Sequence, residues 1–91
     1  MGKKQAHILY SGTVQGVGFR YRTQSIAQSL NIKGWVRNLA NGKVEIIAQA
    51  NKKELDEFIV AVEDCFGDYI RDKQLDFQNA AEILKGFDIS F

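Results

Sequence analysis

Proline is absent from this sequence of 91 residues, and cysteine, histidine and tryptophan each occur once. The single cysteine, Cys65, cannot form a disulfide within the chain, which suits a reducing compartment, and we expect a cytoplasmic protein. No run of about 20 apolar residues is present, so we expect no membrane-spanning segment and no membrane partner. The length is enough for one domain and too short for two, and we treat residues 1–91 as a single domain.

Acidic residues are nearly absent from the first half of the chain. Residues 1–50 hold seven lysines and arginines against one acid, Glu45, whereas residues 51–91 hold ten acids against five bases. A basic half is typical of a site for an anionic ligand, although complementary faces of a sheet and a helix would give the same asymmetry. No carboxylate lies in residues 1–44 that could hold Mg²⁺, so we expect chemistry without a metal. The acidic second half could still supply ligands through the fold.

The spacing of apolar residues predicts seven secondary-structure elements. We expect strands at residues 6–12, 35–39, 43–49 and 70–78, helices at residues 19–31 and 52–66, and a short last strand in which Phe87, Ile89 and Phe91 alternate. Asn51 and Glu54 predict a capping box before the second helix, and Gly67 predicts its end. This β-α-β-β-α-β order predicts a ferredoxin-like α+β sandwich, an antiparallel sheet of four to five strands with two helices on one face. Many unrelated activities share that fold.

The turn between the second and third strands decides which residues share a face of the sheet. A three-residue loop at residues 40–42 pairs Arg37 with Glu45 on one face and leaves the apolar residues of both strands on the other. A two-residue loop would mix the faces, so we expect three residues. Asn38 is then a polar residue at the end of an apolar face, which needs an explanation.

Residues 13–18 form a loop with two glycines between a strand and a helix, a pattern typical of phosphate binding. The backbone N–H groups of such a loop and of the helix N-terminus both attract phosphate. Gly16 and Gly18 lack the Cβ atoms that would block a close approach. Arg20 puts a cation in the first helical turn, where the helix dipole disfavours it, and residues that break a local rule are often functional. A surface arginine beside a structural turn is the alternative.

Two separated motifs resemble the signatures of the acylphosphatase family. Residues 12–20, Gly-Thr-Val-Gln-Gly-Val-Gly-Phe-Arg, are similar to the first signature, and residues 34–38, Gly-Trp-Val-Arg-Asn, with residues 42–46 are similar to the second. The resemblance covers residues 6–66 well. It implies that the chain hydrolyses acyl phosphates to a carboxylate and inorganic phosphate without a cofactor.

The resemblance also implies a role for each motif residue. Arg20 and Asn38 would be the catalytic residues, with Arg20 binding the phosphate and Asn38 orienting the attacking water. Backbone N–H groups would complete the phosphate site, from Gln15, Gly16, Val17, Gly18, Phe19 and Arg20. Asparagine is no base and arginine stays protonated, so the substrate's own phosphate is the expected proton acceptor.

Two other readings of the same fold are a module that binds an anion without turnover and one that binds RNA. RNA-recognition motifs stack bases on aromatic residues of the third strand, and residues 44–47 contain none. A net charge of +1 is also small for a nucleic-acid binder, so we expect no nucleic-acid partner. A monomer is the expected state.

Three further polar residues are candidates for lesser roles. His7 lies in the first strand, well before the glycine-containing loop, and Cys65 lies late in the second helix, so we expect both to be structural. Thr23 lies one turn after Arg20 and is a candidate for supporting the substrate site from the first helix.

Overall fold

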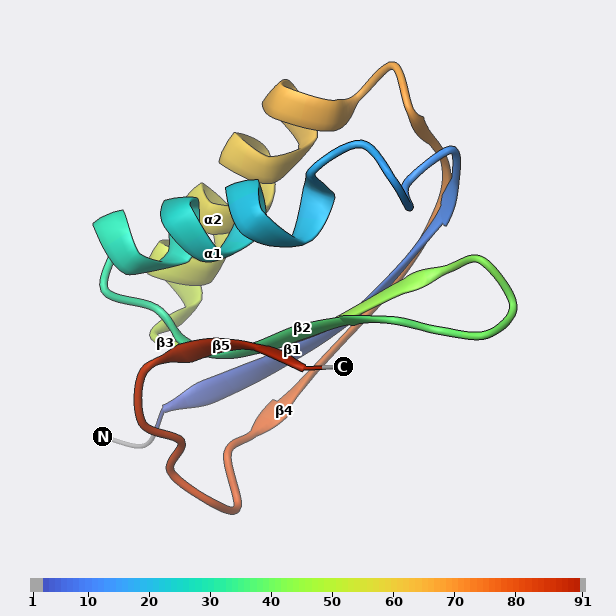
Figure 1. Cartoon of the computed structure of the whole chain (residues 1–91). Helices are drawn as coiled ribbons and strands as arrows, with labels where there is room; N and C mark the ends of the chain where they lie inside the picture. The colour runs from blue at the N-terminus through green and yellow to red at the C-terminus, as the bar shows by residue number, and fades with distance from the viewer. Residues whose placement is uncertain (1–2, 91) are drawn as a thin grey trace.

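Strands and helices follow one another in the order that the sequence predicts (Figure 1). The computed structural model describes residues 3–90. The elements, in chain order, are β1 (Lys4–Gly12), α1 (Phe19–Ser29), β2 (Lys33–Asn38), β3 (Val44–Ala50), α2 (Lys52–Phe66), β4 (Ile70–Asn79) and β5 (Phe87–Ser90). Phe91, which the predicted last strand includes, lies outside the described residues.

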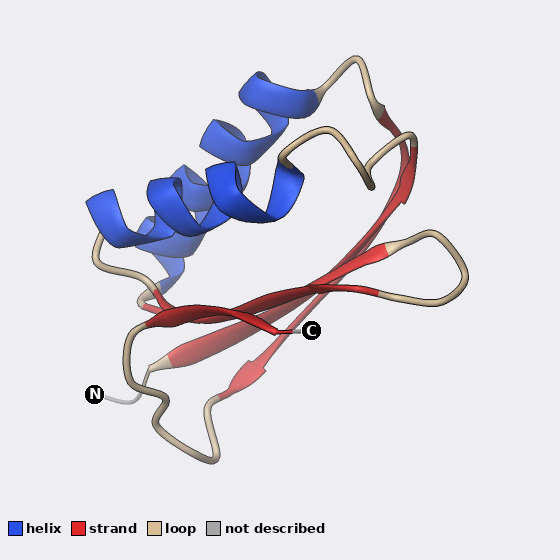
Figure 2. Cartoon of the chain, viewed as in Figure 1, coloured by secondary structure: helices blue, strands red, loops and turns tan. Residues whose placement is uncertain are grey.

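The strands form one sheet in the order β4-β1-β3-β2-β5, and α1 and α2 cover one of its faces (Figure 2). This confirms the ferredoxin-like sandwich, with β3 between β1 and β2. The pairs β4–β1, β1–β3 and β3–β2 are antiparallel, whereas β5 pairs with β2 in parallel. The sheet is therefore mixed. β4 ends at the end of the sheet where β2 begins. β5 starts from that same end, on the edge opposite β4, and so runs in the same direction as β2.

The hairpin between β2 and β3 has the predicted three-residue loop. Leu39 N–H donates to Lys43 O at 2.8 Å and closes it. Arg37 is paired with Glu45 and Asn38 with Val44. The helix-facing residues of these strands are fully buried, namely Val36, Val44, Ile46 and Ala48. The register therefore puts Asn38 on the face that the helices cover.

The helices end by different means. α1 ends two residues earlier than predicted, because Asn31 takes a left-handed φ of 57° and Ile32 N–H donates back to Ala27 O at 2.8 Å. The capping box of α2 is confirmed, with Asn51 and Glu54 each accepting from the other's backbone N–H. α2 stops at Gly67 as predicted, although that glycine keeps a right-handed conformation. Local sequence thus sets the start of α2 and the end of each helix.

Candidate active site

The glycine loop, which we define as residues 13–18, carries the chain from β1 to α1. Gly16 and Gly18 have φ values of 79° and 78°, a conformation that glycine adopts without strain. Gly18 is also the N-cap residue of α1, and no side chain of residues 3–90 caps that helix end. The N–H groups of the first turn are therefore available to a ligand at the positive end of the helix dipole.

Phe19 anchors the start of α1 in the core. It is 2% exposed, and its ring centroid lies 4.4 Å from that of Phe66 and 5.7 Å from that of Tyr10. Only its backbone can therefore meet a ligand. The Tyr10 hydroxyl donates to Glu63 Oε2 at 2.9 Å, and burial together with this carboxylate raises the pKa of Tyr10. Arg20, which directly follows Phe19 in α1, is half-buried.

Asn38 is the last residue of β2 and lies beside Val44 on the helix-facing side of the sheet. Its Oδ1 is buried and has no hydrogen-bond partner among residues 3–90. Buried acceptors without a partner are rare in folded proteins, and each calls for a reason such as a contact with water or a ligand. Packing alone does not explain an asparagine at this position.

A pocket of about 250 Å³ brings the two predicted catalytic residues together. Its lining residues come from the glycine loop, α1 and β2, and are Val14, Gly16, Gly18, Phe19, Arg20, Tyr21 and Asn38. Three of the predicted phosphate-binding positions, Gly16, Gly18 and Phe19, are therefore in the pocket with Arg20. The arrangement joins a cation, an uncapped helix N-terminus and an amide oxygen around one small volume.

Gln15 and Val17 are the predicted site residues that do not line this pocket. The side chain of Gln15 instead donates to the hairpin, at Leu39 O and Lys43 O. Val17 lines a neighbouring pocket of about 490 Å³ together with Arg22, Cys65 and others.

Two of the lining residues, Val14 and Tyr21, are not among the predicted site residues. Val14 is fully buried and Tyr21 is 65% exposed. Val14 belongs to the first motif, and Tyr21 directly follows Arg20. Their nearness in sequence to the predicted site residues is the signal that could have pointed to Val14 and Tyr21. An exposed tyrosine at the mouth of the pocket offers an apolar surface to a ligand there.

The three residues that sequence analysis treated as lesser candidates are spread over the fold. Thr23 is fully buried, and its Oγ1 has no hydrogen-bond partner among the residues that the structure describes. Cys65 is exposed. His7 is on the face of the sheet without helices, where its Nε2 lies 2.7 Å from Glu45 Oε2. His7 is therefore not part of the pocket.

Glu45 links two basic residues on that open face of the sheet. Arg37 Nε donates to its Oε1 at 2.7 Å, and the Arg37 guanidinium also lies 5.0 Å from the Trp35 ring centroid. Burial alone would raise the pKa of Glu45, but the hydrogen bonds and charges of His7 and Arg37 outweigh it and lower the pKa. The network ties β1, β2 and β3 together away from the pocket.

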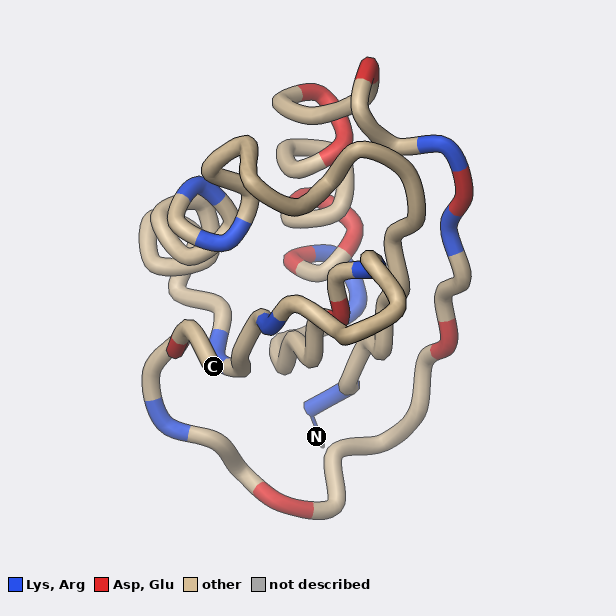
Figure 3. Tube along the Cα trace, turned by 45° about the vertical axis from the view of Figure 1, so that its right-hand side comes forward, with Lys and Arg blue, Asp and Glu red and all other residues tan. Residues whose placement is uncertain are grey.

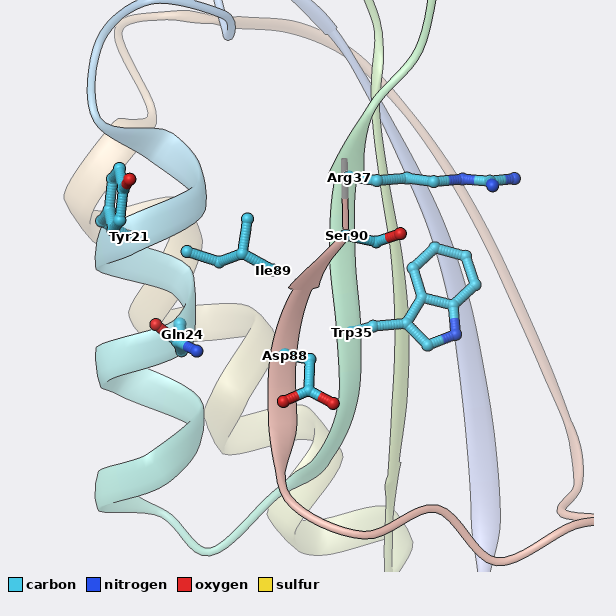
Figure 4. A pocket seen from close by; sticks show the side chains of 7 residues that line it. All are labelled: Tyr21, Gln24, Trp35, Arg37, Asp88, Ile89 and Ser90. Atoms are coloured by element: carbon cyan, nitrogen blue, oxygen red, sulfur yellow. The ribbon is translucent and has the colours of Figure 1, made fainter.

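A third pocket, of about 900 Å³, lies at the β5 edge of the sheet. It is lined by Tyr21, Gln24, Trp35, Arg37, Asp88, Ile89 and Ser90 (Figure 4). In Figure 4 Trp35 and Arg37 point away from α1, whereas Ile89 points toward it. Arg37 is already paired with Glu45 there, and the pocket shares only Tyr21 with the smaller one. Asp88 adds a carboxylate to its lining, so this pocket suits an anion less well than the pocket of Arg20 and Asn38 does.

Charge is divided between the two helices. Arg20 and Arg22 begin α1, which has no acid, whereas acidic residues gather along α2 (Figure 3).

Within residues 3–90 no three His, Cys, Asp or Glu side chains are grouped so that they could hold a metal ion. Neither described helix is long and apolar enough to cross a membrane.

The sequence and fold both match known proteins. The model of the acylphosphatase family matches residues 6–89. An acylphosphatase of Treponema denticola is 59% identical over 56 residues, and one of Methanospirillum hungatei is 52% identical over 56 residues. These alignments cover 62% of this chain and 60% and 62% of the two relatives, so the matched region spans about three fifths of their length.

A solved structure extends the match over the whole fold. The crystal structure of acylphosphatase from Bacillus subtilis superposes with a TM-score of 0.88 at 32% sequence identity, covering 97% of this chain and 99% of that one. Because the family model spans nearly all of the chain and this structure matches 97% of it, the resemblance to the family is confirmed. This chain belongs to the acylphosphatase family.

Proposed function

We propose that this chain is an acylphosphatase, which hydrolyses the carboxyl-phosphate bond of acyl phosphates to a carboxylate and inorganic phosphate without a metal or cofactor. Membership of the family supports the reaction class. The observation that carries the proposal is the pocket shared by Arg20 and Asn38 at the uncapped N-terminus of α1. Its volume of about 250 Å³ suits a phosphoryl group with a small part of the acyl chain.

In this proposal the phosphoryl group binds between Arg20 and the backbone of residues 15–20. The planar guanidinium matches two phosphate oxygens, and the N–H groups of the loop and first helical turn bind the rest of its charge. The start of α1 at Gly18 supports this arrangement, because no side-chain cap from the described residues occupies those donors. These contacts stabilise charge that builds up on the phosphoryl oxygens in the transition state.

Asn38 then holds the attacking water. Its Oδ1 accepts a hydrogen bond from the water, whose oxygen attacks phosphorus from the side opposite the acyl group. The bond from phosphorus to the acyl oxygen breaks, the electron pair leaves with the carboxylate, and one water proton moves to a phosphoryl oxygen. The buried Oδ1 of Asn38, which has no hydrogen-bond partner in the part of the chain that the structure describes, supports this role. An acyl phosphate has a good leaving group, so positioning and charge stabilisation suffice.

The rest of the proposal concerns the setting of the reaction. We propose a cytoplasmic monomer that acts on small acyl phosphates and binds neither nucleic acid nor membrane. The exposed thiol of Cys65 suits a reducing compartment. The open face of β3 presents Glu45 and Ile47, which offer no ring for stacking bases.

Hydrolysis of benzoyl phosphate in ¹⁸O-labelled water, with EDTA present, tests this function. We expect turnover that EDTA does not reduce, with the label in inorganic phosphate and none in benzoate. Label in benzoate would mean attack at the carbonyl carbon and would contradict the role given to Asn38. A folded protein without turnover would refute the activity, and titration with inorganic phosphate would then test an anion-binding module.

A further inference from the structure

The side chain of Gln15 joins the glycine loop to the β2–β3 hairpin. Its Nε2 donates to Leu39 O at 2.8 Å and to Lys43 O at 3.0 Å, so both of its amide hydrogens are used. Leu39 directly follows Asn38, and Leu39 and Lys43 are the residues that close the hairpin loop. One partly buried side chain therefore reaches from the phosphate side of the pocket to the strand end that carries Asn38.

The hairpin tip, residues 39–43, lies beyond the regular ladders of the sheet. Asn38 and Val44 are the last pair between β2 and β3, and Tyr10 and Val44 are the last between β1 and β3. Beyond them, the other hydrogen bonds of residues 39–43 that involve described residues join the tip to itself. Figure 1 shows the hairpin tip and the glycine loop at the same end of the sheet.

We propose that Gln15 is a positioning residue, whose side chain fixes Asn38 relative to the glycine loop. The inference rests on the proposed function, since the loop would hold the phosphoryl group and Asn38 the water. In-line attack requires both reactants in one geometry, and a displacement of about 1 Å can cost roughly 100-fold in rate. Gln15 thus contributes through its side chain as well as through its backbone N–H group.

Gln15→Met tests the proposal, because methionine keeps the length of the side chain and cannot donate. We expect kcat for benzoyl phosphate to fall by about 10- to 100-fold, since the water is misplaced. The inhibition constant of inorganic phosphate should change by less than about threefold, because Arg20 and the loop remain. A loss of phosphate affinity as large as the loss of kcat would overturn the proposal.

Gln24→Met is the matched control. Gln24 Nε2 also donates to a backbone carbonyl, Phe87 O at 2.9 Å, from a partly buried position outside the site pocket. We expect this variant to lose a comparable amount of thermal stability and to keep its kcat. If Gln24→Met lowers kcat as much as Gln15→Met does, the effect is one of stability, and the positioning role is wrong.

A double-mutant cycle shows whether Gln15 acts through Asn38. If it does, adding Gln15→Met to Asn38→Ala should lower kcat by less than about twofold further, because the water is already lost. If Gln15→Met lowers kcat as much in the Asn38→Ala protein as it does in the wild type, the proposal is wrong.

A readout without catalysis separates this inference from the proposed function. In ¹⁵N NMR spectra, Gln15→Met should shift the side-chain amide resonance of Asn38, and Gln24→Met should not. Absence of turnover in the wild type would refute the proposed function alone, since the resonance would still decide the positioning role. An unchanged Asn38 resonance in Gln15→Met would overturn that role.

Discussion

Arg37 and Glu45 lie directly opposite each other in the β2–β3 ladder, with Arg37 Nε 2.7 Å from Glu45 Oε1. Because side chains alternate along a strand, this pair on the open face puts Asn38 on the helix-covered face. A register slip of one residue would turn Asn38 to the open face, away from Arg20. The ion pair therefore marks the register on which the proposed site depends.

The stability of the protein should depend on pH through Glu45. Its pKa is lower in the folded chain than the value of about 4.3 expected when unfolded, so the unfolded state binds more protons between the two values. The stabilisation is complete above the unfolded pKa and is lost as the pH falls through the folded pKa. Glu45→Gln should cost about 1 kcal/mol at pH 7, and this gap to wild type should shrink below about pH 5.

Urea unfolding of both proteins between pH 7 and pH 3 measures that gap. Glu57→Gln, which removes an exposed carboxylate on α2, is the control and should follow the wild type throughout. A gap between wild type and Glu45→Gln that stays constant down to pH 3 would show that the carboxylate charge is not what stabilises the network.

Gly34→Ala should disrupt β2 more than any other alanine substitution in this strand. Gly34 has a φ of 148°, and a Cβ there would lie 1.8 Å from Ile47 O, a backbone atom of the neighbouring strand. We expect a loss of at least about 3 kcal/mol or no folded protein, since the two strands would have to separate. Gly42→Ala is the control, because a Cβ there meets nothing within 4 Å and costs only its backbone strain at φ 89°. Equal unfolding midpoints for the two variants would contradict this explanation.

Gln49 should prove essential for the attachment of residues 80–86. It is 1% exposed, its Nε2 donates to Gln5 Oε1 and to Glu82 O, and its Oε1 accepts from Leu84 N–H at 2.9 Å. Gln49→Leu should lower the unfolding free energy by about 1–3 kcal/mol, because the backbone groups of Glu82 and Leu84 lose their hydrogen bonds to Gln49. Hydrogen exchange at Leu84 N–H should become faster. Gln78→Met replaces an exposed glutamine and is the control, which should change neither the unfolding free energy nor this exchange rate. Unchanged protection at Leu84 would show that the segment is held by other contacts.

Local rules in the sequence predicted most of the fold. Alternation gave the strands, and the faces of β2 and β3 followed from the length of one turn, because only a three-residue loop pairs Arg37 with Glu45. Asn51 and Glu54 marked the start of α2, since a capping box is encoded within four residues. Each of these features depends on neighbours in the chain.

Features that depend on distant segments could not be predicted in this way. Gln49 alternates as an outward-facing residue, yet it is buried because residues 80–86 fold over it. The parallel direction of β5 depends on which edge of the sheet it reaches. The bonds of Gln15 to the hairpin join residues 24 and 28 positions apart. The assignment of Arg20 and Asn38 to catalysis stays a prediction, to which the structure adds their shared pocket.

Turnover of benzoyl phosphate by wild type, Arg20→Ala and Asn38→Ala, measured side by side on folded protein, tests the central claim most directly. We expect each substitution to lower kcat by at least about 100-fold, since each removes a group that acts on the transition state. Arg20→Ala should also weaken inhibition by inorganic phosphate, whereas Asn38→Ala should leave it nearly unchanged. Either variant retaining wild-type kcat while circular dichroism shows the native fold would contradict the account.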